Sequence, residues 1–322
     1  MNRFIALILK LSVSATLIYL LVSKFGLHEI WQVIKDMNPY VFAAAVVLYW
    51  IATFISCLRW RHFIPQKVSI RRLFSFYLIG AFFNICMPGM IGGDAVKAYY
   101  LNRELKVPGN KEQKSVKAAD ISSSVVSIAS VFMDRYMGAV ALITLCMAGL
   151  PVGYVYISST PLVWLLPAVA AVFLIASVMI FWVKAFTNFG WINKAYRYFD
   201  KYKKMPAVLL KTYGYSIVVQ LISILSAYIV ALGLGINQPF IVFFVFFPLI
   251  IFVSMIPVSI SGIGLREGAF VVLLGTVGTA PEKAVAISLV WFLSSAAAGL
   301  AGLVEYLRIK ALSGGYVKEQ SF

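Results

Sequence analysis

The stretch IPVSISGIGLRE, residues 256–267, lies within an apolar region and interrupts it with a proline, two glycines, an arginine and a glutamate. Pro257 cannot donate a backbone hydrogen bond, and Gly262 and Gly264 favour backbone angles that a helix does not use. Broken backbone with charges at membrane depth is tolerated only where protein or a watery cavity surrounds it. The stretch therefore predicts a broken helix and is the first candidate for a functional site.

The composition is that of an integral membrane protein. Hydrophobic residues make up 61% of the 322 positions and charged residues 12%, and the mean hydropathy is +0.90. The apolar runs are about 20 residues long, the length that a helix needs to cross a bilayer, and they lack the alternation of a β-barrel. The sequence predicts an all-α polytopic membrane protein with a single membrane domain, residues 1–322.

Basic residues outnumber acidic ones by 28 to 12, which gives a net charge of +16. They gather in a few loops, as positive-inside orientation produces, and no basic groove with interleaved aromatic residues is present. We therefore expect membrane lipids as partners and no nucleic acid. The cysteines form no CxxC pair and the two histidines, His28 and His62, are isolated, so we expect no metal site and no cofactor.

The first half of the chain contains three predicted spans and a short broken segment. Residues 4–22 are interrupted by Lys10 and lack a clear cleavage site, so they predict an uncleaved first span rather than a signal peptide. Residues 73–87 are short for a crossing, and the segments on either side, 59–72 and 97–117, are both basic. A full crossing between two cytoplasmic loops is excluded by the positive-inside rule. This region therefore predicts a re-entrant hairpin that turns at residues 88–93.

The second half repeats this order. Its basic loop is residues 184–211 and its uncharged outside loop is residues 233–238, so residues 240–279 must begin and end outside and predict a second re-entrant hairpin. The six predicted full spans are residues 4–22, 40–58, 118–150, 162–183, 213–232 and 284–307. Loops are expected at 24–38 and 151–160.

The eight hydrophobic segments predict an inverted repeat, with halves at residues 1–150 and 160–310 and a short cytoplasmic tail at 311–322. Many transporters follow this plan, and their sites lie where paired broken helices approach the bilayer midplane. The two halves also share a weak pattern counted from Pro88 and Pro257. A glycine follows five residues later and a cation nine residues later, which pairs Gly93 with Gly262 and Lys97 with Arg266.

Arg266 and Glu267 are the charges most in need of explanation, because an arginine or glutamate at the centre of a span costs about 2.5–3.5 kcal/mol on insertion scales. They can pair with each other or with Asp134 and Arg135, or they can snorkel to the outer surface. We favour a third alternative, in which Arg266 binds an anionic group through its planar fork of donors. The glycine turn leads into a helix expected to begin near Leu265, whose N-terminal amides would also face the anion.

The segment MPGMIGGDAVK, residues 87–97, is the matching turn in the first half. It is glycine-rich but has neither a P-loop nor a dinucleotide-binding fingerprint, and no strand precedes it. Asp94 is placed to cap the following helix, with ion binding as the alternative. Asn84 either satisfies broken backbone or lines a cavity. Gly92 and Gly93 supply the turn.

Asp134 and Arg135 interrupt the long span 118–150, either as an ion pair across facing helices or near the cytoplasmic end of a tilted helix. Near the end of the chain, small residues at four-residue spacing favour close helix packing within the fold over dimerisation. These are Ser295, Ala298, Gly299 and Gly302. No HExxH, GxSxG or other pair of nucleophile and base is present, so we expect the chain not to be an enzyme.

The run PVSISGIGLREGAF at residues 257–270, together with Asn84, MPGMIGGD at residues 87–94 and the Asp134–Arg135 pair, resembles the flippase-like family. This family is also called the lysylphosphatidylglycerol synthase transmembrane region, and the resemblance extends over nearly the whole chain. Ser261 departs from it, because the family often has another glycine there. The resemblance implies a polytopic inner-membrane protein that moves an amphipathic lipid between leaflets.

Bifunctional members of that family carry a soluble aminoacyl-transferase domain after the membrane part. This chain ends at Phe322, soon after its last predicted span, so we expect no synthase domain and no phosphatidylglycerol lysyltransferase activity. The alternatives are a membrane enzyme of lipid modification and a non-transporting scaffold for a glycosyltransferase. A separately encoded lipid-modifying enzyme is a further candidate partner, and the sequence gives no prediction of the oligomeric state.

The hypothesis favoured by the sequence is a flippase for an anionic phospholipid, an aminoacylated lipid or a polyprenyl-linked lipid. It would lie in the plasma (inner) membrane with both termini in the cytoplasm, and transport would run downhill or use an ion gradient. One side of the expected substrate site consists of Arg266, Glu267, Ser261 and the amides near Gly262 and Gly264. The other side consists of Asn84, Gly92, Gly93, Asp94, Asp134 and Arg135.

Overall fold

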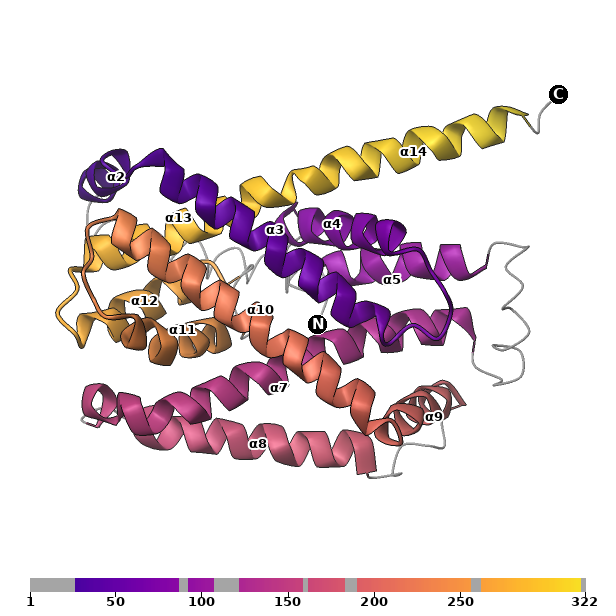
Figure 1. Cartoon of the computed structure of the whole chain (residues 1–322), viewed down its shortest axis with the longest axis horizontal. Coiled ribbons are helices and arrows are strands. Elements are labelled where there is room, and N and C mark those ends of the chain that lie inside the picture. Colours follow the sequence, from indigo (N-terminus) through magenta and orange to yellow (C-terminus); the bar gives the residue numbers. More distant parts are fainter. Residues whose placement is uncertain are drawn as a thin grey trace, which may run out of the picture.

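The computed structural model describes residues 27–86, 92–106, 122–158, 162–182, 190–255 and 262–319, and within these ranges the chain forms helices and no strand (Figure 1). The all-α prediction is confirmed, and the predicted first span, residues 4–22, lies outside the described ranges. The helices are α2 (Leu27–Lys35), α3 (Pro39–Arg61), α4 (Ile70–Cys86), α5 (Gly92–Leu105), α7 (Ser123–Ile157), α8 (Leu162–Trp182), α9 (Gly190–Lys203), α10 (Pro206–Gly233), α11 (Phe240–Ser254), α12 (Leu265–Gly275), α13 (Pro281–Gly299) and α14 (Ala301–Glu319).

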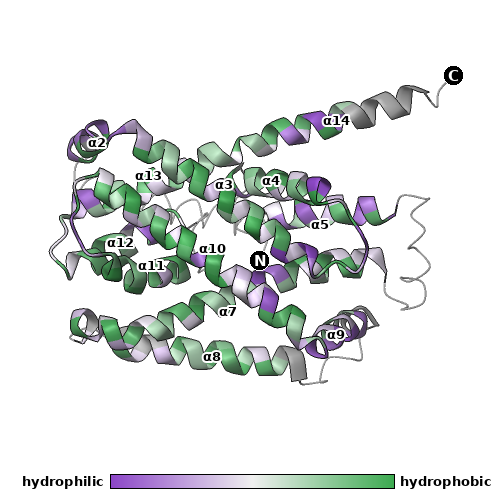
Figure 2. Cartoon of the chain, in the orientation of Figure 1, coloured by the Kyte–Doolittle hydropathy of each residue, from purple (hydrophilic) through white to green (hydrophobic). Residues whose placement is uncertain are grey.

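Four of the described helical stretches are long and apolar enough to cross a membrane: Pro39–Arg61, Ser123–Tyr156, Pro206–Gly233 and Pro281–Ala311. Each coincides with one predicted span, and the last runs through α13 into α14. The hydropathy colouring shows the long apolar stretches of these helices and the polar residues collected towards the ends of the bundle (Figure 2). The protein is therefore a polytopic helical membrane protein.

Several segments predicted as loops contain helix. Residues 24–38 contain α2, residues 184–211 contain α9, and α7 continues through Pro151 to Ile157. Loop assignment from charge reports the side of the membrane and not the backbone conformation. In α9, Tyr198 and Tyr202 lie four residues apart and are both buried, so this basic segment gains a buried face when it is helical.

Two long helices, α3 and α10, cross in the middle of the bundle and contact each other (Figure 1). Around them, α13 packs on α3 and α7 packs on α10. Two pairs of short helices complete the bundle. The first helix pair, α4–α5, packs on α14 and α7, whereas the second helix pair, α11–α12, packs on α7 and α13.

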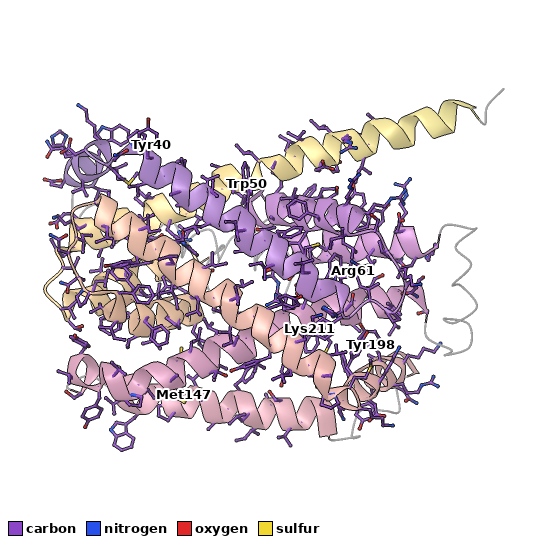
Figure 3. All side chains as sticks on the ribbon, viewed as in Figure 1. Tyr40, Trp50, Arg61, Met147, Tyr198 and Lys211 are labelled. Atoms are coloured by element: carbon purple, nitrogen blue, oxygen red, sulfur yellow. The ribbon has the colours of Figure 1, made fainter. Side chains whose placement is uncertain are left out.

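Each helix pair lies in its own hydrophobic core. The core around α11–α12 also draws on α2, α7, α10 and α13, and its largest buried side chains are Phe243, Phe246, Phe247 and Phe270. The core around α4–α5 also draws on the end of α3, on α7 and on α9, and contains Trp60, Phe63, Leu73 and Leu101. Side chains from neighbouring helices project into the spaces between them (Figure 3).

The predicted small-residue packing is present between α4 and the junction of α13 with α14. A Cβ atom added at Gly302 would lie 2.0 Å from the carbonyl oxygen of Leu78, and one added at Gly299 would lie 2.4 Å from Cδ1 of Ile85. Only glycine permits this approach of two helix backbones. The small residues therefore pack within the fold, as predicted.

We predict that Gly302→Ala destabilises the protein by about 1–3 kcal/mol, the usual cost of overpacking, because the carbonyl of Leu78 belongs to a helix backbone and cannot rotate away. Thermal unfolding in detergent micelles measures the effect. Gly214→Ala in α10 is the matched control, because a Cβ there meets nothing within 4 Å. Alanine is also the better helix former, so this control should be as stable as the parent or more so. Equal melting temperatures for the two variants would contradict the close approach of α4 and α14.

Candidate functional site

The second helix pair turns where the sequence predicts a broken helix. Gly262 and Gly264 have φ angles of +76° and +88°, which favour glycine, and α12 begins at Leu265 as expected. A Cβ at Gly262 would lie 3.0 Å from both the Cβ and the carbonyl oxygen of Ser254. The turn thus passes close to the end of α11. Ser261 lies outside the described residues.

Arg266 and Glu267 pair with each other. The Nη2 atom of Arg266 donates to Oε1 of Glu267 at 2.7 Å, and its Nε donates to Oγ of Ser288 at 2.8 Å. The Ser288 hydroxyl donates to the same Glu267 oxygen at 2.7 Å, while the amide of Gly264 donates to the other oxygen at 2.6 Å. The face of Phe292 lies 4.7 Å from the guanidinium carbon. Both carboxylate oxygens of Glu267 and the Nε and Nη2 atoms of Arg266 thus have hydrogen-bond partners.

Among the alternatives left open by the sequence, the snorkelling one is wrong, because the side chains of Arg266 and Glu267 are only 5% and 4% exposed. Pairing with Asp134 or Arg135 is also wrong, since those residues have other partners in the described structure. Substrate binding by Arg266 remains a prediction. In the state described here the pair satisfies itself and Ser288 on α13 supplies a polar contact to a second helix.

In the first helix pair, Asn84 satisfies broken backbone, one of its two predicted roles. Its side-chain oxygen accepts a hydrogen bond from the amide of Gly93 at 2.9 Å. A Cβ at Gly93 would lie 1.9 Å from the carbonyl oxygen of Gly80, so α4 and α5 touch backbone to backbone. Gly92 begins α5. These contacts hold the start of α5 against α4.

Asp94, in the first turn of α5, forms a two-pronged ion pair with Arg135 on α7. The Nε atom of Arg135 donates to Oδ2 at 2.7 Å and Nη2 donates to Oδ1 at 2.9 Å. The side chain of Arg135 is 44% exposed and that of Asp94 is 16% exposed. The geometry is the fork-to-fork arrangement that guanidinium groups form with carboxylate and phosphate.

Asp134 is fully buried and its two carboxylate oxygens accept bonds from three helices. Oδ1 accepts from Nε of Arg59 at 2.8 Å, and Oδ2 accepts from the Tyr77 hydroxyl at 3.0 Å. The ammonium of Lys97 lies 3.4 Å from Oδ2 and also 3.5 Å from Asp94. The prediction of an ion pair across facing helices is thus confirmed for Asp134, with α3 and α5 as the facing helices.

Arg59 extends the contacts to a further helix. Its Nη1 atom donates to Oγ of Ser216 on α10 at 2.9 Å. Gly138 on α7 lies beside the guanidinium, since a Cβ there would be in van der Waals contact with Nη1 at 3.4 Å. Arg59 and Lys97 were missed as site residues, because charges at the end of an apolar run look like ordinary loop charges. The repeated cation nine residues after each proline was the one signal that pointed to Lys97.

We call the five charged residues joined by these contacts the charged cluster. Its members are Arg59, Asp94, Lys97, Asp134 and Arg135. Three cations and two carboxylates give it a net charge of +1. Buried charges are costly unless paired, and each cation of the cluster has a carboxylate partner within it.

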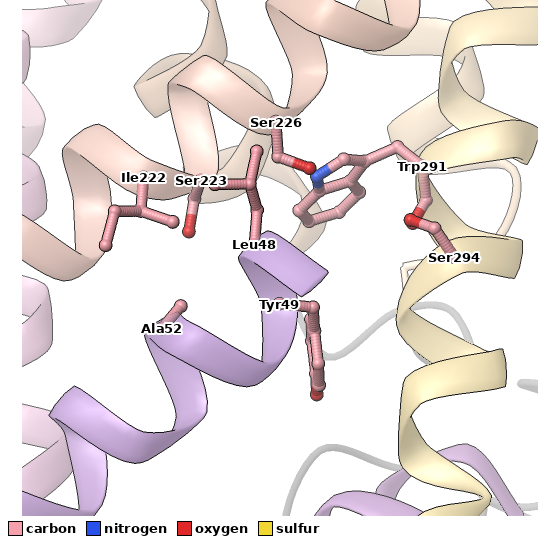
Figure 4. Close-up of a pocket in the computed structure, with 8 residues that line it drawn as sticks. All are labelled: Leu48, Tyr49, Ala52, Ile222, Ser223, Ser226, Trp291 and Ser294. Atoms are coloured by element: carbon pink, nitrogen blue, oxygen red, sulfur yellow. The ribbon is translucent and has the colours of Figure 1, made fainter. Parts of the chain in front are cut away.

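A small recess lies where α3, α10 and α13 meet, with room for about one water molecule (Figure 4). Its lining includes Tyr49, Trp291, Ser223, Ser226 and Ser294. The recess thus lies between α3, α10 and α13, and its polar lining consists of three serines, a tyrosine and the indole of Trp291.

We predict that Asp134→Ala destabilises the fold by about 3–5 kcal/mol, because it leaves Arg59 and Lys97 buried without their carboxylate. Denaturant or thermal unfolding in micelles measures the loss. The double variant Arg59→Met with Asp134→Leu removes both partners of one pair and should recover part of the stability. An Asp134→Ala protein as stable as the parent would show that the buried carboxylate does not hold these helices together.

The fold and the site define a class: a polytopic helical membrane protein with charged residues buried where short helix pairs meet long spans. The sequence matches the family described as the lysylphosphatidylglycerol synthase TM region over residues 7–302, and the chain belongs to that family. The resemblance carried by residues 257–270, by residues 87–94 and by the Asp134–Arg135 pair is thereby confirmed. The comparison with curated proteins gave no match.

Proposed function

We propose that this protein is a flippase that moves a phosphate-containing lipid between bilayer leaflets. The observation that carries the proposal is Arg135, a partly exposed cation on a membrane-spanning helix, joined to a charged cluster with a net charge of +1. Intramembrane charges of this kind commonly mark a substrate path. Membership of a family named for the membrane part of a lipid synthase supports a role in lipid handling. No catalytic step is proposed.

The pattern of helix contacts supports an inverted repeat as the basis of transport. If α2, α3, α4, α5 and α7 are exchanged for α9, α10, α11, α12 and α13–α14, the main contacts are preserved. The contact of α3 with α13 becomes that of α10 with α7, and α4 with α14 becomes α11 with α7. Likewise α5 with α7 becomes α12 with α13, and α2 with α13 becomes α9 with α7. In this proposal α4–α5 and α11–α12 are re-entrant hairpins that enter from opposite ends of the bundle (Figure 1).

The polar contacts support the same correspondence. Lys97 and Arg266, the repeated cations, each reach the next long helix of their own half, where Lys97 meets Asp134 and Arg266 meets Ser288. Each cation also lies over an aromatic ring, 3.9 Å from the centroid of Tyr77 for Lys97 and 4.7 Å from that of Phe292 for Arg266. In this proposal a headgroup would move between these two places, while the acyl chains stay in the bilayer.

We propose that the basic end of the bundle faces the cytoplasm of a cell whose inner membrane holds the protein. Arg61, Lys211 and Tyr198 lie near this end (Figure 3). The pKa of His62, just beyond α3, is lowered by partial burial and by the charges of Lys211 and Arg61, so the basic groups gather closely there. An excess of basic residues is the usual mark of the cytoplasmic side.

The transport proposal is tested with purified protein in liposomes that contain fluorescent phospholipids, by following the rate at which leaflets exchange. Arg135→Gln should slow exchange about tenfold or more, because a hydrogen-bonded charge contributes about 1.5–3 kcal/mol. Arg72→Gln is the matched control, since Arg72 pairs with Glu104 on the same hairpin but is 61% exposed and lies outside the charged cluster. Exchange no faster than in empty liposomes across a panel of headgroups would refute the proposal, as would an Arg135→Gln protein as active as the parent.

The repeat requires that the ends of the two hairpins lie on opposite sides of the membrane. In a background without native cysteines, Asn237→Cys should react with an impermeant maleimide added to intact cells, whereas Lys106→Cys should react only after permeabilisation. Both positions are exposed, so accessibility within the protein does not limit the reaction. Labelling of both positions from the same side would exclude the inverted arrangement.

A further inference from the structure

The Arg135–Asp94 pair differs from the buried ion pairs because a ligand can reach it. The side chain of Arg135 is 44% exposed, whereas the side chains of Arg59, Lys97 and Arg266 are 5% exposed or less. Arg59 is further held by Ser216, and Arg266 by Ser288. Of the cations in the two buried groups, Arg135 is the one that a lipid headgroup can contact without first breaking a sealed pair.

The hydrogen bonds between Asp94 and Arg135 have the geometry that a phosphate group would form with the same guanidinium. Both Asp94 oxygens accept bonds from the guanidinium, at 2.7 and 2.9 Å, and a phosphodiester with its two non-bridging oxygens can take the same place on the fork. Asp94 would not be left unpaired by such an exchange. Lys97 already lies 3.5 Å from its Oδ1 atom and 3.4 Å from Asp134, so this ammonium can serve either carboxylate.

The charge of the cluster selects the ligand. With three cations and two carboxylates, the cluster is neutralised by a ligand that brings one negative charge. A phosphodiester headgroup without an amine carries one such charge, whereas a zwitterionic headgroup carries none. A zwitterion would also need its ammonium group placed against Asp94.

We infer that Asp94 occupies the site of the substrate phosphate in the lipid-free protein, and that a monoanionic phosphodiester lipid binds by displacing the Asp94 carboxylate from Arg135. Asp94 is then an internal competitor of the substrate and not one of its ligands. This inference rests on the proposed function, because it names the headgroup that the transport path takes up first.

The inference predicts that one variant of a charged residue at the site binds the lipid more tightly, not more weakly, than the parent protein. Asp94→Asn removes the competing carboxylate and should tighten binding of dihexanoyl-phosphatidylglycerol about tenfold, whereas Arg135→Gln should abolish binding. Isothermal titration of the full chain in micelles measures both. Glu104→Gln, which removes the carboxylate of the exposed Arg72 pair, should leave binding unchanged. Unchanged or weaker binding by Asp94→Asn would overturn the inference.

Two further measurements test the two-pronged contact and the charge of the headgroup separately. Arg135→Lys preserves the charge but removes the fork, so it should weaken phosphatidylglycerol binding about tenfold, and full binding by this variant would exclude the two-pronged contact. This readout decides the matter even if Asp94→Asn does not fold. Dihexanoyl-phosphatidylethanolamine is the zwitterionic probe, and if it binds as tightly as phosphatidylglycerol and loses affinity in Asp94→Asn, Asp94 is an ammonium ligand and the inference fails.

Inorganic phosphate distinguishes a lipid site from a site for the free ion. Binding of phosphate as tight as that of the short-chain lipid would overturn the lipid assignment. The outcomes also separate this inference from the proposed function. Tighter phosphatidylglycerol binding by Asp94→Asn without any leaflet exchange would uphold the phosphate site and refute the flippase. Leaflet exchange without tighter binding by Asp94→Asn would support the flippase and refute the displacement of Asp94 by the lipid phosphate.

Discussion

The buried carboxylate of Asp134 is the contact on which the charged half of the structure depends. It is fully excluded from solvent and accepts from Arg59 on α3 and from Tyr77 on α4, with Lys97 on α5 close by. Through Arg59 the same network reaches Ser216 on α10. A carboxylate in such a place is unfavourable alone and acceptable only with several partners. It therefore specifies how α3, α4, α5 and α10 sit around α7, since any other arrangement leaves a charge unpaired.

The two helix pairs solve the same problem in different ways. In α5, Asp94 and Lys97 have partners on α7, so the first pair cannot shift against α7 without breaking ion pairs. In α12, Arg266 is paired with the next residue of its own helix, and its one described polar contact to another helix is the hydroxyl of Ser288. The second helix pair therefore holds both charges, Arg266 and its counter-ion Glu267, on the same helix. A shift of α12 along α13 would break the two hydrogen bonds that Ser288 forms with Arg266 and Glu267, but it would leave the ion pair itself intact.

Much of this arrangement could be predicted from the sequence, because its causes are local. Span length, the positive φ angles at Gly262 and Gly264, the beginning of α12 at Leu265 and the role of Asn84 each follow from residues close in the chain. The partners of the charges could not be predicted in this way. Asp134 and Arg59 lie 75 positions apart, and Arg266 could equally have paired with Asp134 or with Glu267 on composition alone.

The positive-inside rule, which was used to place the loops, also led to two wrong predictions. It treated Arg59 as a surface charge although the residue turns back into the bundle, and it treated the segment of α9 as loop although its tyrosines are buried. The α9 segment is basic overall, but a helix can still bury the face that carries its tyrosines. A basic residue next to an apolar run reports which side of the membrane the chain end prefers, but its long side chain can still reach inward when a buried carboxylate offers a partner.

The unequal charge of the two hairpins bears on how the proposed transport would work. Under the proposed repeat, Lys97 and Arg266 are equivalent, yet Arg266 lies in a neutral and sealed pair, whereas Lys97 lies in a cluster with a surplus cation that includes the exposed Arg135. In the proposed mechanism an anionic headgroup would therefore be attracted first to the α4–α5 side. A path that were equally positive along its length would hold the headgroup instead of releasing it, because each step would have to break a charge-assisted contact. The Arg266–Glu267 pair at the second hairpin is neutral, so a headgroup that arrived there would meet no unpaired charge and could be released.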